Sequence, residues 1–268
     1  MPARQAGLWR ERRGSGAPVL LFLHGLGATG EVWRGAFELA GGWPGARVLV
    51  DLPGHGRSAR LDDYSYEAHA LALRGLLGAS PGPVVVAGHS MGGLVGILLS
   101  AERFGLEVAA VLGLGIKVRW SDEDVEGMRR RAGQPVRWFD TREEAAARYL
   151  RSVGLDAVAG PAGLEAVTGP AGPIVSSGIA EVDGRWRLAF DPAANGVGQP
   201  DMARSLAEAR APVTLARGSG DQMVGAADLA ALPCEVRELP GLGHNAHVED
   251  PAAVWGLVAS VAAAGGVV

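Results

Sequence analysis

VVVAGHSMGG, residues Val84 to Gly93, is the stretch on which the predicted fold depends. Its unbroken apolar start predicts a strand buried on both faces, and residues 94–102 have the apolar density and length of a helix. Between the two, Gly88 and Gly92 each lie two residues from Ser90. This G-x-S-x-G spacing is typical of a nucleophile elbow, a strained turn that admits only minimal side chains beside the serine.

Short apolar runs alternate with helical segments on both sides of this stretch. Such alternation favours right-handed β–α–β crossovers and a parallel sheet that is covered by helices on both faces. The predicted fold class is therefore α/β, with a doubly wound, mostly parallel sheet. We expect an edge strand at 8–12, buried strands at 19–23, 84–87 and 108–114, further strands at 48–50 and 212–216, and an alternating last strand at 234–239. Helices are expected at 29–40, 64–77, 94–102 and from 251 onward.

The alternation is interrupted in the middle of the chain. Two capping boxes, at Ser121–Asp124 and Thr141–Glu144, predict helix starts, and a Gly/Pro-rich stretch follows at 154–173. Asp183–Gly184, between two alternating segments, predicts a β-hairpin. Because this region contains no continuous apolar strand, we interpret it as a mainly helical cap inserted over the sheet. The predicted division is an α/β core, residues 1–116 and 201–268, and a cap, residues 117–200.

Composition limits the remaining classes of function. A chain of 268 residues is long enough for one large domain with an insertion. The net charge of −4 comes from interspersed charges, so we expect a small-molecule substrate rather than nucleic acid or a membrane surface. A single cysteine excludes a disulfide framework and a multi-thiolate metal site, and we expect no metal or cofactor. Residues 1–14 lack an apolar stretch of signal-peptide length, which predicts a cytoplasmic protein.

Ser90 needs partners if it is to act as a nucleophile. A hydroxyl becomes reactive when a base removes its proton, and a third group must hold that base in the correct tautomer. Asp221 and His244 each follow a predicted strand directly, and the carboxyl ends of parallel strands meet at one edge of the sheet. His247 stays open as an alternative base, and Asp51 as a weaker alternative for the acid.

Five motifs, in this order and spacing, together resemble the α/β-hydrolase superfamily, in its serine hydrolase form with a cap insertion. The resemblance covers about residues 18–115 and 211–262 and is specific for the fold rather than for the substrate. The motifs are HGLG at 24–27, DLPGHGRS at 51–58, GHSMGG at 88–93, GSGD at 218–221 and GLGHNAHVEDP at 241–251.

The resemblance implies a role for each matching residue. Ser90 would be the nucleophile, Asp221 the acid that orients the base, and His244 the general base. The backbone NH groups of Leu26 and Met91 would form the oxyanion hole. For Met91 this also follows from physics, since its NH opens the helix after the elbow and points toward developing negative charge.

Other residues are candidates for structure or for substrate binding. His24 and His55 are expected to be structural, and His69 to be a half-exposed helix residue. Four tryptophans are either core residues or the lining of an acyl pocket under the cap: Trp33, Trp120, Trp138 and Trp186. Three arginines either recognise a substrate carboxylate or lie on solvated helix faces: Arg119, Arg137 and Arg148.

These features favour a serine hydrolase that cleaves a small carboxylic ester, lactone or thioester through an acyl-enzyme. Serine at position 90 argues against an epoxide hydrolase or dehalogenase, which the superfamily resemblance would associate with aspartate there. Carbon–carbon bond hydrolysis and cofactor-free perhydrolysis remain alternatives because the same triad supports them. A ligand-binding or signalling protein with slow turnover is the alternative from a different class.

Overall fold

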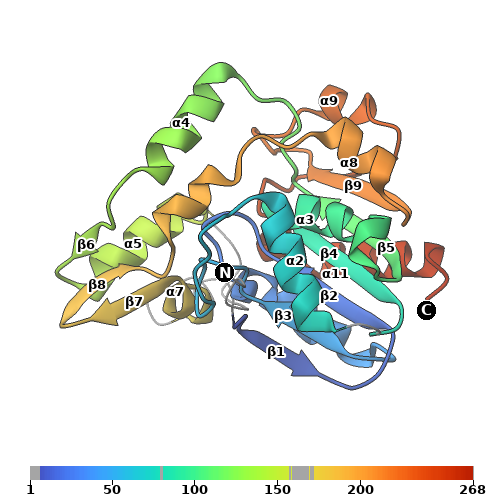
Figure 1. Ribbon diagram of the computed structural model, residues 1–268, viewed down its shortest axis with the longest axis horizontal. Helices are drawn as coiled ribbons and strands as arrows, with labels where there is room; N and C mark the ends of the chain where they lie inside the picture. The colour runs from blue at the N-terminus through green and yellow to red at the C-terminus, as the bar shows by residue number, and fades with distance from the viewer. Residues whose placement is uncertain (1–6, 79–80, 157, 159–168, 170–171, 268) are drawn as a thin grey trace.

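A seven-stranded sheet forms the centre of the computed structural model, which describes residues 7–78, 81–156, 158, 169 and 172–267. Every neighbouring pair of strands is parallel except β1 with β3, which confirms the predicted α/β class and the N-terminal edge strand (Figure 1). The strands, in their order across the sheet, are β1 (Arg10–Arg13), β3 (Arg47–Val50), β2 (Val19–Leu23), β4 (Val84–His89), β5 (Val108–Leu114), β9 (Val213–Gly218) and β10 (Glu235–Leu239).

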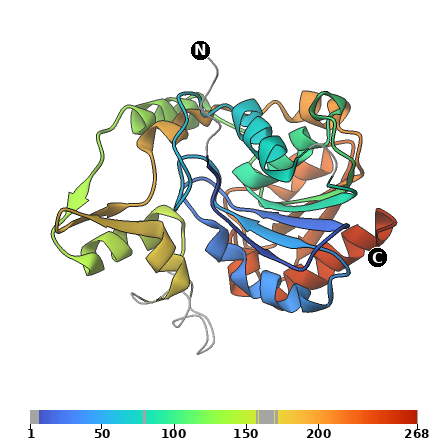
Figure 2. The same ribbon diagram turned by 60° about the horizontal axis from the view of Figure 1, so that its bottom comes forward.

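Helices cover both faces of this sheet, because side chains alternate between the two faces along each strand. Leu21 packs in an apolar cluster with α2, α3 and α8, whereas Leu20 and Phe22 pack in a second cluster with α1 and α11. Figure 2 shows these two helix layers on either side of the sheet. The helices are η1 (Gly30–Trp33), α1 (Arg34–Leu39), η2 (Ala40–Gly42), α2 (Tyr66–Leu77), α3 (Met91–Leu99), η3 (Glu102–Phe104), α8 (Met202–Glu208), α9 (Ala226–Ala230), α10 (Ala246–Glu249) and α11 (Pro251–Ala264), where η denotes a 3₁₀ helix.

Of the helices in the described ranges, none combines the length and the apolar character that crossing a bilayer requires. The helix predicted at 29–40 is present as three short pieces, η1, α1 and η2. Close packing on neighbouring segments sets the path of these pieces more than local helix propensity does. A Cβ added at Gly30 would lie 3.0 Å from the Val50 oxygen, and one added at Gly35 would lie 2.5 Å from Pro251 Cγ.

The segment between β5 and α8 forms the region predicted as the cap. The capping boxes of Ser121 and Thr141 are both present, and Asp183 and Gly184 turn the predicted hairpin with φ values of +50° and +77°. The sequence did not indicate β6, which completes a three-stranded antiparallel sheet in the order β6-β8-β7. Most of the Gly/Pro-rich stretch lies outside the described residues. The elements are α4 (Asp122–Ala132), β6 (Trp138–Phe139), α5 (Arg142–Ser152), α7 (Pro173–Gly178), β7 (Ile179–Val182), β8 (Arg185–Leu188) and η4 (Pro192–Val197).

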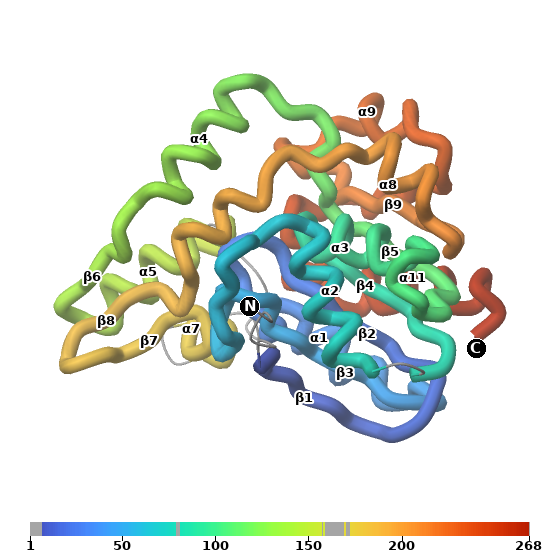
Figure 3. The backbone as a smooth tube through the Cα atoms, viewed as in Figure 1, coloured from blue at the N-terminus to red at the C-terminus, as the bar shows by residue number. Residues whose placement is uncertain are grey.

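The chain returns from this region to the sheet through η4, which packs along α4 (Figure 3). On the way it is fixed to the loop that follows β3. The Gly56 NH donates to the Ala189 oxygen at 2.6 Å, the Asp191 NH donates to the Gly54 oxygen at 2.8 Å, and the Tyr64 hydroxyl donates to Asp191 Oδ2 at 2.9 Å. The second sheet is therefore held to the core by its own exit segment. The boundaries at 117 and 200 stay a prediction.

Three buried histidines lie beneath this attachment. The ring of His55 is 4.9 Å from that of His24 and 6.4 Å from that of His69, measured between centroids. The expectation of a half-exposed His69 is wrong: its exposed fraction is 0%, because α2 brings it against the rings of Tyr64 and His55. Burial lowers the pKa of His55 to about 4, and burial together with the charge of His55 lowers the pKa of His69 to about 3.

We expect these histidines to make the protein sensitive to mild acid. Below pH 6.5 the unfolded chain binds a proton at residue 69, but the folded chain does not until about pH 3, so stability falls as the pH is lowered through that window. The His69→Leu variant has no imidazole at this position, so it lacks this loss of stability in acid. Urea unfolding at several pH values measures this effect. Below pH 6.5 the free energy of unfolding of the variant should rise relative to that of the wild type by up to about 1.4 kcal/mol for each pH unit. A difference that is constant with pH would contradict the prediction.

Candidate active site

Ser90 lies between β4 and α3 with a left-handed backbone, φ +49° and ψ −117°. The glycines on either side of it are required by packing. A Cβ added at Gly88 would lie 2.5 Å from the Gly92 oxygen, and a Cβ added at Gly92 would lie 2.6 Å from the oxygens of Leu23 and His24. Both contacts are with backbone, which has little room to move. The sequence motif therefore forms the strained turn that its spacing predicts.

Asp221 and His244 meet at the carboxyl ends of β9 and β10. His244 Nδ1 donates to Asp221 Oδ2 at 2.9 Å, and Asp221 Oδ1 accepts the Met223 NH at 2.8 Å. Burial by itself raises the pKa of Asp221, but the hydrogen bond and charge of His244, with the NH groups of Met223 and Val224, outweigh it and lower that pKa. Asp221 is therefore charged at neutral pH and fixes the proton of His244 on Nδ1, which leaves Nε2 free to accept a proton.

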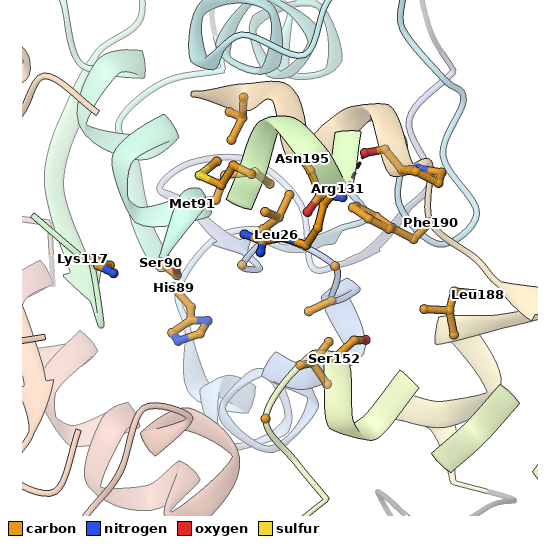
Figure 4. Close-up of a pocket in the computed structure, with 18 of the residues that line it drawn as sticks. Leu26, His89, Ser90, Met91, Lys117, Arg131, Ser152, Leu188, Phe190 and Asn195 are labelled. Carbon is orange, nitrogen blue, oxygen red and sulfur yellow. Dashed lines mark hydrogen bonds between the residues drawn. The ribbon is translucent and has the colours of Figure 1, made fainter. Parts of the chain in front are cut away.

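Ser90 and His244 line the same cavity, whose volume is about 840 Å³. Figure 4 shows Ser90 and His89 on one side of the opening, with Ser152 and Leu188 on the other. Within the described residues no hydrogen bond joins the Ser90 hydroxyl to His244. Such bonds are often long in unliganded sites and shorten when substrate binds.

Two backbone NH groups beside Ser90 match the predicted oxyanion hole. Met91 is the first residue of α3, where an NH has no partner within the helix. Leu26 follows Gly25, which packs so closely on the elbow that an added Cβ would lie 3.2 Å from Ser90 Cβ. Neither NH donates to any group in the described part of the chain. Both side chains line the cavity, so they shape the pocket while their backbones remain free to donate.

His89 supports the site and was not singled out from the sequence. Its Nε2 donates to the His244 oxygen at 3.0 Å, and its ring lies 4.7 Å from that of His244. Burial, followed by the charges of His247 and His244, lowers the pKa of His89 well below its usual range. A neutral His89 therefore holds the backbone of the loop that carries His244. The position of His89 next to Ser90 in the motif is the sequence signal that could have identified it.

The alternatives for base and acid occupy structural positions. His247 is fully buried against Trp33 and His89, and neither of its ring nitrogens has a hydrogen-bond partner among the described residues. Asp51 is fully buried and accepts the Gly30 NH at 2.8 Å and Arg57 Nε at 2.7 Å. Asp221 is thus paired with His244, not with His247, and the Asp51 carboxylate is already fully used within the core.

His24 and His55 also hold backbone, as predicted. His24 Nδ1 donates to the Gly25 oxygen, and its Nε2 accepts the Leu52 NH, both at 2.8 Å. His55 Nδ1 donates to the Pro53 oxygen at 2.8 Å. His24 therefore links the oxyanion loop to the loop after β3.

Of the four candidate tryptophans, only Trp120 is among the described residues that line the cavity. Placing Trp33 in the pocket was wrong, because its indole is fully buried and donates to the Leu23 oxygen at 2.9 Å. Trp138 was wrong as well, because successive side chains of a strand face opposite sides and its neighbour Phe139 faces the cavity. Trp186 precedes Leu188 by two residues on β8 and so lies nearer the hairpin turn. Its ring packs against Arg142 and does not line the cavity.

The three candidate arginines also differ in whether they line the cavity. Arg119 does not line the cavity and pairs with Asp228 at 2.9 Å. Arg137 and Arg148 do line it, together with Arg131 and Arg151, which were not among the candidates. In the described residues no group of three or more His, Cys, Asp or Glu side chains has the arrangement of a metal site.

The comparisons with known proteins agree with this geometry. Residues 20–257 match the model of the alpha/beta hydrolase family, and the chain belongs to that family, which confirms the prediction of a hydrolase of this type. It is 39% identical over 100 residues to Lipase LipV of Mycobacterium tuberculosis (strain ATCC 25618 / H37Rv), a match that covers 37% of each protein. The chain thus spans about a third of the length of that relative.

Two other similarities extend over nearly the whole chain. The 2-succinyl-6-hydroxy-2,4-cyclohexadiene-1-carboxylate synthase of Klebsiella pneumoniae (strain 342) is 28% identical over 251 residues, which cover 93% of this chain and 95% of the synthase. The solved structure of the M. tuberculosis esterase Rv0045c has a TM-score of 0.72 and 23% identity, and the match covers 97% of this chain and 92% of that one. The structural similarity shows a shared fold.

Gly92→Ala tests the close packing of the elbow. Because the added Cβ meets backbone at 2.6 Å, we expect the free energy of unfolding to fall by about 2 kcal/mol or more. Gly256→Ala in α11 is the matched control, since a Cβ there has nothing within 4 Å and alanine favours a helix by about 0.5–1 kcal/mol. Chemical denaturation measures both variants, and equal stability of the two would contradict the packing argument.

Proposed function

We propose that this protein is a serine hydrolase that cleaves a carboxylic ester, lactone or thioester through an acyl-enzyme. The observation that carries the proposal is the hydrogen bond between His244 and Asp221, next to a cavity that also exposes Ser90 on a strained turn. The two free NH groups of Met91 and Leu26 on the same side support it. Two similar proteins, a lipase and an esterase, support the same reaction class.

The mechanism follows from the position of each group. His244 Nε2 takes the proton of Ser90 as the hydroxyl oxygen attacks the carbonyl carbon, and the NH groups of Leu26 and Met91 stabilise the resulting oxyanion. His244 then gives its proton to the leaving alkoxide or thiolate, and the acyl group remains on Ser90. Water, deprotonated by His244, attacks the acyl-enzyme and releases the acid. Asp221 stabilises the imidazolium in both halves without itself becoming protonated.

Hydrolysis of a carbon–carbon bond is the second candidate. A relative named a synthase is similar over 93% of the chain, whereas the similarity to the lipase covers 37%, so a reaction other than ester hydrolysis remains a candidate. The same Ser90, His244 and Asp221 would serve it, with His244 moving a proton on the substrate. Release of acid from simple esters and thioesters separates the two candidates.

We expect Ser90→Ala to abolish both labelling and turnover. A fluorophosphonate probe reacts with an activated serine, so the wild type should be labelled at Ser90 and the variant should not. Hydrolysis of short p-nitrophenyl esters should fall in the variant by at least about 10⁴-fold, since the nucleophile is lost. Labelling without turnover would favour the binding or signalling alternative. A wild type that is not labelled, or a variant labelled equally well, would end the hydrolase proposal.

Asp221→Asn is expected to lower kcat/KM by about 10⁴-fold while the fold is retained, because an amide does not hold His244 in the required tautomer. Asp228→Asn is the matched control, since that carboxylate pairs with Arg119 outside the cavity and its loss should change kcat/KM less than about twofold. Steady-state kinetics, together with near-ultraviolet circular dichroism to monitor folding, measure both. Similar rates in the two variants would show that Asp221 does not orient the base.

A further inference from the structure

The cavity that contains Ser90 has two parts of different character. Its floor comes from core elements and is apolar around the serine, with Met91 and Leu94 on α3 and Ile116 after β5. The segment that closes it from above, which spans α4 to α5, supplies mainly positive charge. The cationic residues among the described lining are Lys117, Arg131, Arg137, Arg148 and Arg151.

This positive charge is not balanced within the site. Asp124 is the one acidic residue among the described lining, and Lys117 pairs with it at 2.8 Å. None of the four arginines forms an ion pair with a described carboxylate, whereas Arg119, just outside the cavity, pairs with Asp228. Unpaired guanidinium groups that converge on a concave site attract anions, and their fork of NH donors matches a carboxylate or a phosphate.

The arrangement of charge along the two helices explains this convergence. Both α4 and α5 carry acidic residues in the first turn and arginine in the last turn. This order of charges interacts favourably with the helix dipole, so arginine in the last turn of a helix does not by itself indicate a function. Here Arg131 of α4 and Arg148 and Arg151 of α5 also line one cavity, while Arg129, Arg130 and the acidic first turns, apart from Asp124, do not. Arg148 and Arg151 are three residues apart and therefore share a face of α5.

The end of α5 is fixed to the loop that carries His244. Asn245 Nδ2 donates to the oxygens of Val153 and Gly154, at 3.0 and 3.1 Å. Asn245 is the neighbour of His244, so the arginines of α5 have a defined position relative to the base. A group held by Arg148 and Arg151 would thus place a substrate against Ser90 rather than bind at an unrelated surface.

We infer that the substrate carries an anionic group, a carboxylate or a phosphate, which Arg148 and Arg151 hold while an apolar portion lies on the core side next to Ser90. The inference rests on the proposed acyl-transfer function and narrows its substrate class. Arg131 and Arg137 contribute further positive charge to the same part of the cavity. A neutral ester of the same size fills the apolar part but leaves the guanidinium groups without a partner.

The experiment compares matched pairs of substrates that differ only in the anionic group. Monomethyl adipate against methyl hexanoate tests a carboxylate on the acyl part, and S-butyryl-4′-phosphopantetheine against S-butyryl-pantetheine tests a phosphate on the leaving group. In the wild type, kcat/KM should be at least about tenfold higher for the anionic member of one pair. The pair that shows this preference identifies the source of the anion.

Two double variants with equal change of charge locate the effect. In Arg148→Gln/Arg151→Gln the ratio of anionic to neutral kcat/KM should fall about tenfold. Arg129→Gln/Arg130→Gln removes the same charge from exposed positions of α4 that do not line the cavity, and it should leave activity and ratio unchanged. A ratio near one in the wild type for both pairs, or an equal loss of the ratio in both variants, would overturn the inference.

Binding to Ser90→Ala separates this inference from the proposed reaction. Isothermal calorimetry should give a Kd for monomethyl adipate or S-butyryl-4′-phosphopantetheine at least about tenfold lower than for its neutral partner, and the difference should be lost when Arg148→Gln/Arg151→Gln is added. If the wild type hydrolyses no ester but this selectivity is present, the proposed function fails and the anion site stands. If Ser90 is labelled and the wild type hydrolyses neutral and anionic esters equally well, the anion site is wrong and the proposed function stands.

Discussion

The left-handed backbone at Ser90 is the constraint on which the rest of the site depends. A residue with φ near +49° is held there only if its surroundings leave no alternative, and here β2, β4 and α3 approach so closely that Gly88 and Gly92 have no room for a Cβ. The turn directs the side chain of Ser90 away from the sheet and places the first NH of α3 beside it. The residues predicted to be the nucleophile and an oxyanion donor therefore come from one local fold.

The other functional groups are positioned by neutral histidines and buried backbone hydrogen bonds. His24 joins the oxyanion loop to the loop after β3, and His89 holds the carbonyl of His244. Because both rings are fully or nearly fully buried, they are held in their neutral forms and act as fixed donors and acceptors. The charge at the centre of the site is thereby confined to Asp221 and to the imidazolium that forms beside it.

The fold and the substrate are determined by different parts of the chain. The elbow, the His244 loop and the sheet define a member of the alpha/beta hydrolase family, a fold that supports many reactions. The region between β5 and α8 supplies Trp120, Arg148 and Arg151 to the cavity, and Asn245 fastens its helix α5 to the catalytic loop. The cavity is therefore lined by two separate parts of the chain, this region and the sheet edge that carries Ser90 and His244.

The sequence by itself determined the α/β class and the elbow, because strand periodicity and glycine spacing are local properties that survive any change in distant packing. Asp221 and His244 were named from their places after predicted strands and from the family resemblance, and the hydrogen bond that pairs them is a tertiary contact. Only the tertiary structure decided which side chains of the inserted segment face the cavity. Trp33 and Trp138 were misplaced, and Arg131 and Arg151 were missed, because periodicity along a helix or strand shows that two faces exist but not which neighbour each face meets. His69 was judged half-exposed for the same reason: its burial depends on His55, in a loop that precedes α2 and packs against this helix.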